Sequence, residues 1–96
     1  MRWYITVEAV RQYMRIQGYV GSTDGPIFDR AAIELEDLCD QAELKKEWAH
    51  DGKPRQLWQV RAMVGDYRTR LELTVAMEPR PEGPLPQLVR VRDKGA

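Results

Sequence analysis

Hydrophobic residues follow one period at the start of the chain and another a few positions later. The segment RWYIT, residues 2–6, favours an extended chain, whereas from Val7 onward apolar residues recur at the i, i+3, i+4 spacing of a helix. Thr6 stands at the change, and its hydroxyl is suited to cap the helix, so no turn residue is needed between the two. Gly18 predicts a left-handed end of the helix. We therefore expect a short strand that leads directly into a helix.

A second amphipathic segment covers residues 26–46. Pro26 suits its first turn, and Thr23 and Asp24 are the candidate caps. The apolar residues form one helical stripe: Phe28, Ala31, Ala32, Leu35, Leu38, Cys39 and Ala42. Acidic residues occupy the rest of the circumference: Glu34, Glu36, Asp37, Asp40 and Glu43. The pattern predicts a helix with an acidic outer side, followed by a loop at AHDGKPRQ, residues 49–56.

Alternation with a period of two predicts strands at LWQVRAMV, residues 57–64, and YRTRLELTVAM, residues 67–77. Gly65-Asp66 between them fits a two-residue type II′ turn. This turn sets a register in which three pairs lie on the helix-covered face: Val64 with Tyr67, Ala62 with Thr69, and Val60 with Leu71.

The chain after this hairpin predicts a loop and one more strand. EPRPEGPLP, residues 78–86, is rich in Pro and Gly and is interpreted as a loop. QLVRVRD, residues 87–93, predicts a strand with Val89 and Val91 on one face and Leu88, Arg90 and Arg92 on the other. The expected fold is an α+β domain of order β-α-α-β-β-β, with two helices packed on one face of a small antiparallel sheet.

Length and composition narrow the class of protein. The 96 residues suffice for one domain, residues 1–96, and the 15 basic and 15 acidic residues give no net charge. A nucleic-acid binder driven by bulk charge is therefore not indicated, although local patches are allowed. With one cysteine, no Cys/His metal spacing, no signal peptide and no long apolar run, we expect a cytoplasmic protein without cofactor, metal or membrane contact.

The charges are sorted along the chain. Residues 1–20, 21–51 and 52–96 carry net charges of +2, −6 and +4. The predicted hairpin places Arg61 directly opposite Arg70, and the alternation sends three further arginines to the same side. We call these five residues the arginine face: Arg61, Arg68, Arg70, Arg90 and Arg92. Like charges opposed on a sheet are destabilising, so the pair calls for solvation, relief from Glu72, or an anionic partner.

Both charged surfaces have two interpretations. The arginine face is either the solvated side of a half-covered sheet or a binding face for nucleic acid or an acidic protein. The acidic side of the second helix, with Glu36, Asp37, Asp40 and Glu43, is either solvated or a docking surface for a basic partner or a second copy of this chain.

The remaining signals favour structural roles. Cys39 lies on the apolar stripe, and His50 stands alone beside Asp51, so a core residue and a surface residue are expected. Trp3, Trp58 and Tyr67 are expected in the core. An exposed Trp3 or Trp48 would instead indicate a contact surface.

One local pattern is similar to a known family. ITVEAVRQY, residues 5–13, has a strand followed by Thr6 and a helix bearing Ala9, Val10 and Tyr13; RQLWQVRAM and TRLELTV suit a central hairpin, and PQLVRVR a closing strand. This arrangement resembles the RelE/ParE-like toxin superfamily and is most similar to its BrnT-like branch. The resemblance implies a scaffold on which basic residues position RNA, and Arg61, Arg70 and Arg90 are the matching candidates.

The departures from this family concern its active groups. Glu8 stands where relatives often have a His, and Gln12 where an Arg follows in the first turns. No Lys or Tyr is clearly placed beside the arginines. The residues therefore favour a retained scaffold without the catalytic groups.

Three functions remain open. The preferred one is a non-enzymatic binding module, of the kind encoded by phages or mobile elements, that engages a nucleic acid or protein through the arginine face. The alternatives are a RelE/BrnT-like ribonuclease toxin of a toxin–antitoxin pair and a structural or regulatory homodimer. The sequence shows no catalytic residue set.

Overall fold

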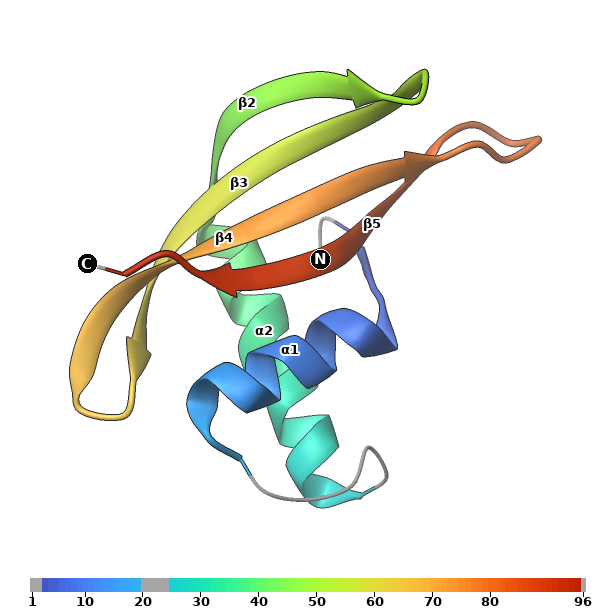
Figure 1. The fold of residues 1–96 in the computed structure, drawn as a ribbon. Coiled ribbons are helices and arrows are strands. Elements are labelled where there is room, and N and C mark those ends of the chain that lie inside the picture. Colours follow the sequence, from blue (N-terminus) through green and yellow to red (C-terminus); the bar gives the residue numbers. More distant parts are fainter. Residues whose placement is uncertain (1–2, 20–24, 96) are drawn as a thin grey trace.

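The computed structural model describes residues 3–19 and 25–95, which form two helices and five strands (Figure 1). In chain order these are β1 (Tyr4–Ile5), α1 (Val7–Gln17), α2 (Pro26–Gln41), β2 (Glu43–His50), β3 (Lys53–Val64), β4 (Tyr67–Glu78) and β5 (Leu85–Asp93). Among these residues, no helix combines the length and apolar character needed to cross a membrane. The α+β class expected from the sequence is confirmed.

The sheet has the order β1-β5-β4-β3-β2 and is mixed rather than purely antiparallel. β1 runs parallel to β5, and every other neighbouring pair is antiparallel. The expected set of four antiparallel strands is therefore wrong in two respects: one strand was missed, and β1 pairs in the parallel sense. β1 lies at the edge of the sheet and contributes only two residues to its ladder.

The junction between β1 and α1 is formed as predicted. The Thr6 hydroxyl oxygen accepts a hydrogen bond from the backbone N–H of Ala9 at 3.2 Å, which caps the helix. The same hydroxyl donates to the carbonyl oxygen of Leu88 at 2.8 Å, so the cap also ties the helix to β5. Gly18 ends α1 in the left-handed conformation, with φ of 74°.

Helix α2 starts as expected but ends earlier. Gly25 occupies the cap position and Pro26 the first turn, whereas the candidate caps Thr23 and Asp24 lie outside the described residues. The helix ends at Gln41, and residues 43–50, predicted to be helix and loop, form β2. If α2 continued past Ala42, Lys46 would be the next residue, four positions on, to point into the core. Lysine is almost never fully buried without a partner, so the sequence does not favour a longer helix.

Strands β2 and β3 are joined by Asp51 and Gly52, not by the predicted loop. Both residues have positive φ, 52° and 75°, as a type I′ hairpin turn requires. The ladder extends from His50 opposite Lys53 to Glu43 opposite Gln59, with a bulge at Lys45. Asp-Gly is a strong hairpin signal, and it was available in the sequence.

The β3–β4 hairpin has the predicted register. Val64 pairs with Tyr67, Ala62 with Thr69 and Arg61 with Arg70. Gly65 has φ of 58° while Asp66 does not have positive φ, which agrees with a type II′ turn. The ladder is longer than predicted, because β3 begins at Lys53.

Strand β5 contains a bulge that the sequence alternation did not predict. Leu88 pairs with Val75 and Arg90 with Thr74, so Val89 is an extra residue between two consecutive pairs. The extra residue reverses the alternation, so Leu88, predicted to be on the outer face, is fully buried, and Val91 lies in the same core. The preceding connection is also shorter than the predicted loop 78–86, because Glu78 and Leu85 pair in the ladder.

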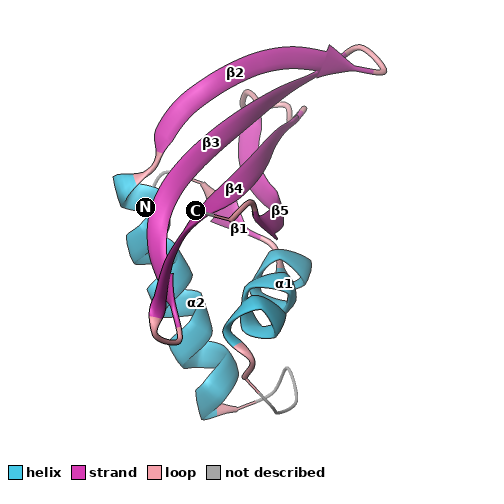
Figure 2. Ribbon diagram, turned by 60° about the vertical axis from the view of Figure 1, so that its left-hand side comes forward, coloured by secondary structure: helices cyan, strands magenta, loops and turns pink. Residues whose placement is uncertain are grey.

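Both helices lie on the same side of the sheet, and the core fills the space between them (Figure 2). Trp3 and Trp58 meet edge to face in this core, with ring centroids 5.0 Å apart. Cys39 is buried, as expected. Tyr67 was expected in the core but is 54% exposed, because it lies beside the β3–β4 turn beyond the reach of the helices. The fully buried side chains are Leu35, Leu71, Leu73, Leu88, Val75 and Cys39.

One acidic residue of α2 serves the helix pair rather than its outer side. The Glu34 carboxylate accepts a hydrogen bond from the Tyr13 hydroxyl at 3.1 Å and another from the Tyr19 hydroxyl at 3.0 Å. Burial, together with the neighbouring carboxylate, raises the pKa of Tyr13. The predicted acidic outer side therefore loses Glu34.

Candidate nucleic-acid interface

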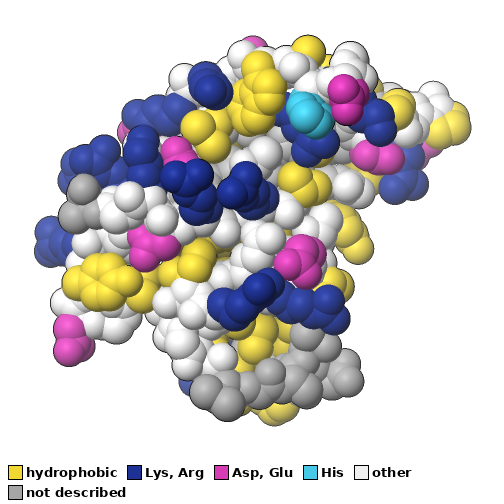
Figure 3. Space-filling view, viewed as in Figure 1, with side chains coloured by type: hydrophobic (Ala, Val, Ile, Leu, Met, Phe, Trp, Pro, Cys, Tyr) yellow, Lys and Arg dark blue, Asp and Glu magenta, His cyan; other side chains and the backbone are white. Residues whose placement is uncertain are grey.

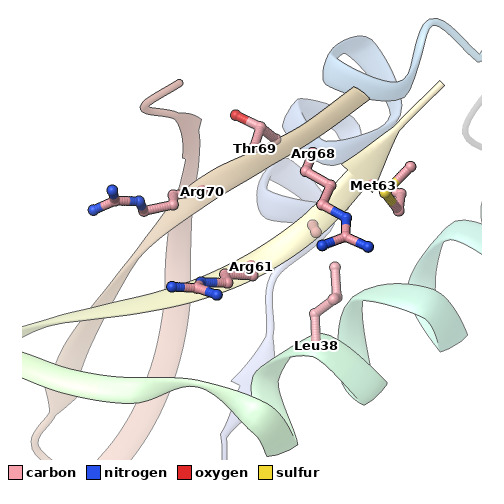
Figure 4. Close-up of a pocket in the computed structure, with 7 residues that line it drawn as sticks. Leu38, Arg61, Met63, Arg68, Thr69 and Arg70 are labelled. Carbon is pink, nitrogen blue, oxygen red and sulfur yellow. The ribbon is translucent and has the colours of Figure 1, made fainter. Parts of the chain in front are cut away.

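All five residues of the arginine face are exposed. The strand pairing places four of them, Arg61, Arg70, Arg90 and Arg92, on the same side of the sheet. Arg61 lies opposite Arg70, Arg92 opposite Glu72, and Arg90 opposite Thr74. Figure 3 shows Lys and Arg side chains gathered across this surface. Arg68 departs from the common direction: in Figure 4 it reaches toward Leu38 of α2, whereas Arg61 and Arg70 extend together the other way.

The Arg61–Arg70 pair is of the close kind. The backbone N–H of Arg70 donates to the carbonyl of Gly95 at 3.3 Å, and its own carbonyl accepts from Lys94 at 2.8 Å. In an antiparallel sheet the N–H and the carbonyl of one residue both point toward the same neighbouring strand. Because both groups of Arg70 bond to Lys94 and Gly95, Arg70 makes no backbone hydrogen bond to Arg61. Such non-hydrogen-bonded pairs bring the Cα atoms to about 4.5 Å, which holds the two side chains close together.

The only carboxylate expected to relieve this pair is engaged elsewhere. Glu72 lies 3.7 Å from the Arg92 Nε and 3.7 Å from the Lys94 Nζ, and its side chain is only 15% exposed. Within the described residues, no ion pair involves Arg61, Arg68, Arg70 or Arg90. The arginine face thus has one member with a carboxylate partner, Arg92, and four that form no ion pair with the described residues.

A hollow of about 480 Å³ lies between α2 and the β3–β4 hairpin. Leu38 and Ala62 contribute apolar surface to its lining. It lies beside the part of β3 that follows Gln59, the last residue of β3 that pairs with β2. Its lining residues are Leu38, Arg61, Ala62, Met63, Arg68, Thr69 and Arg70. Three arginines therefore border one partly apolar hollow (Figure 4).

A neighbouring hollow of about 460 Å³ shares Arg61 and Arg70 and is more polar. Its lining residues are Gln41, Glu43, Lys45, Gln59, Val60, Arg61 and Arg70. Glu43, predicted to lie on the acidic helix, is instead the first residue of β2 and forms an ion pair with Lys45 at 3.3 Å. The predicted docking set is thus divided: Glu36, Asp37 and Asp40 remain on α2, and Glu43 belongs to the sheet.

A third hollow, of about 350 Å³, lies toward the other end of the sheet. It is bordered by residues from α1 and from all four long strands: Gln12, Trp48, His50, Arg55, Thr74, Val89 and Arg90. Of these residues, sequence reasoning assigned Arg90 to the arginine face and named Trp48 as a contact residue only if it proved exposed. Their proximity was not predicted, because residues 43–50 were taken as helix and loop. The Asp51-Gly52 turn was the signal that would have paired Trp48 with Arg55.

The end of the arginine face is held by Asp93. Its carboxylate accepts hydrogen bonds from the Thr69 hydroxyl, from the Gly95 N–H at 2.9 Å and from the Tyr67 hydroxyl at 3.2 Å. The bond from Thr69 is the main cause that holds the pKa of Asp93 below its usual value, while partial burial opposes it. These contacts attach the C-terminal segment to β4 beside Arg68 and Arg70.

Comparison with known proteins adds no family to this geometry. No protein-family model, curated protein or solved structure matches the chain. Function has to be argued from the residues themselves, and the similarity to RelE/BrnT-like proteins stays a prediction.

Proposed function

We propose that this protein is a non-enzymatic module that binds nucleic acid through the arginine face. The observation that carries the proposal is the close Arg61–Arg70 pair without a carboxylate partner. A protein keeps such a repulsive pair at a cost in stability, and an anion bound between the two guanidinium groups would remove that cost. Guanidinium groups suit phosphate because they present paired N–H donors to its oxygens.

The spread of the charges supports a polyanion over a single acidic group. Arg70 and Thr74, the partner of Arg90, are four residues apart on β4, or about 13 Å at the usual rise of a strand. A ligand that contacts both Arg70 and Arg90 therefore carries several negative charges in series, as a phosphodiester chain does. An acidic protein segment is the competing ligand.

A ribonuclease activity is the less supported alternative. General acid–base cleavage of RNA needs a proton acceptor within hydrogen-bond reach of the 2′-hydroxyl. Among the described residues that line the hollow with Arg61, Arg68 and Arg70, none is a histidine or a carboxylate. The neighbouring hollow at Arg61 and Arg70 contains one carboxylate, Glu43, and it forms an ion pair with Lys45 at 3.3 Å. Binding without chemistry, on a scaffold related to RelE/BrnT-like toxins, is accordingly our proposal.

The test is a titration of the full chain with a labelled single strand of roughly ten nucleotides, followed by fluorescence anisotropy at several salt concentrations. The Arg61→Glu/Arg70→Glu variant should bind at least about tenfold more weakly, and its salt slope should fall by about 1.4, since each lost phosphate contact accounts for about 0.7. Gel analysis of the same mixtures reports any cleavage.

The matched control is Arg30→Glu/Arg80→Glu, which changes the net charge equally at two exposed positions away from the arginine face. Its affinity should stay within about twofold of the wild type once the change in net charge is allowed for. Equal losses in both variants would mean that only overall charge matters. Tighter binding of a poly-glutamate peptide than of the oligonucleotide would assign the face to an acidic protein.

A further inference from the structure

Trp48 occupies an unusual place for a tryptophan. Trp3 and Trp58 contact each other in the core, but Trp48 belongs neither to the buried cluster nor to the partly buried residues packed against it. It pairs with Arg55 on the outer side of the sheet and remains partly exposed. The largest apolar side chain of β2 therefore lies outside the core.

The surroundings of Trp48 are basic. The Lys46 Nζ lies 5.2 Å from the centre of its ring, within the range of a cation–π contact. Arg55 and Arg90 border the same hollow, and none of the side chains that line it in the described part of the chain is acidic. The Asp51 carboxylate contacts His50 at 3.6 Å but is not part of the lining.

A flat aromatic surface beside cations recognises a flat ligand that carries negative charge. We infer that the hollow at Trp48 is a stacking site for an unpaired base of a single-stranded nucleic acid, with Arg55 and Arg90 on the adjacent phosphates. This inference rests on the proposed function. It specifies the ligand as a single strand instead of a duplex, and it adds a binding site outside the Arg61–Arg70 pair. In a duplex the base faces are already stacked, so they are not offered to the indole.

The position of Arg90 connects this site with the rest of the arginine face. Arg90 lies opposite Thr74 and Arg92 opposite Glu72, one step further along the same two strands. Arg70 follows after Glu72 on the same side of β4. A single strand anchored by one base at Trp48 is thereby led along β4 and β5 toward Arg61 and Arg70.

The experiment compares three ligands of equal phosphate number on the wild-type chain: a single strand, the same strand with abasic sites in place of its bases, and a duplex. The single strand should bind roughly 5- to 150-fold more tightly than the abasic strand, the range expected for one stacked base. It should also quench tryptophan fluorescence, because Trp48 lines the hollow, whereas Trp3 is only 6% exposed and Trp58 packs against the core.

The Trp48→Ala variant should bind the normal strand no better than the abasic one, with an unchanged salt slope. Trp48→Phe keeps an aromatic ring and should restore part of the difference. Circular dichroism checks that both variants fold. The ligand comparison and the quenching use the wild-type chain only, so they decide the question even if a variant misfolds.

The outcomes separate the two proposals. Equal binding of the normal and abasic strands, with continued dependence on Arg61 and Arg70, would overturn the stacking site and leave the proposed function standing. Duplex binding as tight as that of the single strand, or a mononucleotide as tight as the oligonucleotide, would also overturn it. Failure to bind any of these ligands would overturn the proposed function itself.

Discussion

Arg61 and Arg70 face each other across a close antiparallel pair, and the nearest acidic side chain on their side of β4, Glu72, contacts Arg92 and Lys94 instead. The sheet therefore contains a repulsion that its own residues do not relieve. This repulsion has two opposite consequences: it lowers the stability of the unbound protein, and it favours the binding of an anion.

Replacement of Arg70 should stabilise the unbound protein. Arg70→Thr removes the repulsion and keeps a residue suited to a strand, so the free energy of unfolding in urea should rise by about 0.2–1 kcal/mol. The control is Arg68→Thr, which makes the same exchange opposite the uncharged Met63. If Arg70→Thr is no more stable than Arg68→Thr, the opposed charges carry no cost.

The Asp93 contacts predict a dependence of stability on acid. The pKa of Asp93 is lowered in the folded protein, whereas an aspartate in the unfolded chain has a pKa of about 3.9. Its stabilisation is therefore complete above the unfolded pKa and is lost as the pH falls through the lower folded value. Asp93→Asn should reduce the free energy of unfolding at neutral pH by about 1–3 kcal/mol and flatten its decline in acid.

The matched control for Asp93 is Asp66→Asn in the exposed β3–β4 turn. Its unfolding curves should follow the wild type across the acidic range. An acid dependence in Asp93→Asn as steep as in the wild type would show that other carboxylates dominate.

The Thr6 hydroxyl should matter more than its small size suggests. Thr6→Val keeps the β-branched shape but removes the cap on Ala9 and the bond to Leu88, so thermal unfolding should report a loss of about 0.5–2 kcal/mol. Thr74→Val makes the same chemical change on the outer face and should have little effect. Equal effects of the two substitutions would contradict the capping role.

The Asp51-Gly52 turn should be sensitive at its second position. Gly52 has φ of 75°, so Gly52→Ala should destabilise the protein by about 1–2 kcal/mol. It should also increase hydrogen exchange in β2, which lies at the edge of the sheet and pairs with β3. Asp51→Asn tolerates the left-handed conformation equally well and should leave stability within a few tenths of a kcal/mol. Unchanged exchange in Gly52→Ala would argue against this hairpin.

Local chemistry was enough for several elements. The change of period at Thr6, the Gly18 stop and the β3–β4 register were all predicted, because each depends on residues that are neighbours in the chain or joined by a two-residue turn. The Arg61–Arg70 pairing followed from that register. It is the part of the candidate site that sequence reasoning located correctly.

Strand β2 was missed because its residues Glu43 to Glu47 favour a helix when considered alone. Only pairing with β3 makes the extended form preferable, and that partner is known once the chain is folded. The bulge at Val89 was missed for a related reason: its position depends on how β5 aligns with β4, and one extra residue moves Leu88 from the outer face into the core.

The sequence by itself determined the α+β class, the strand-to-helix junction and the opposition of two arginines, since periodicity, capping and turn geometry act over short distances. The tertiary structure alone decided that Glu72 pairs with Arg92 and Lys94, that Glu43 leaves the acidic helix, and that Trp48 and Arg90 border one hollow. Those relationships join residues from separate strands, and their geometry comes from how the whole sheet twists and closes around its core.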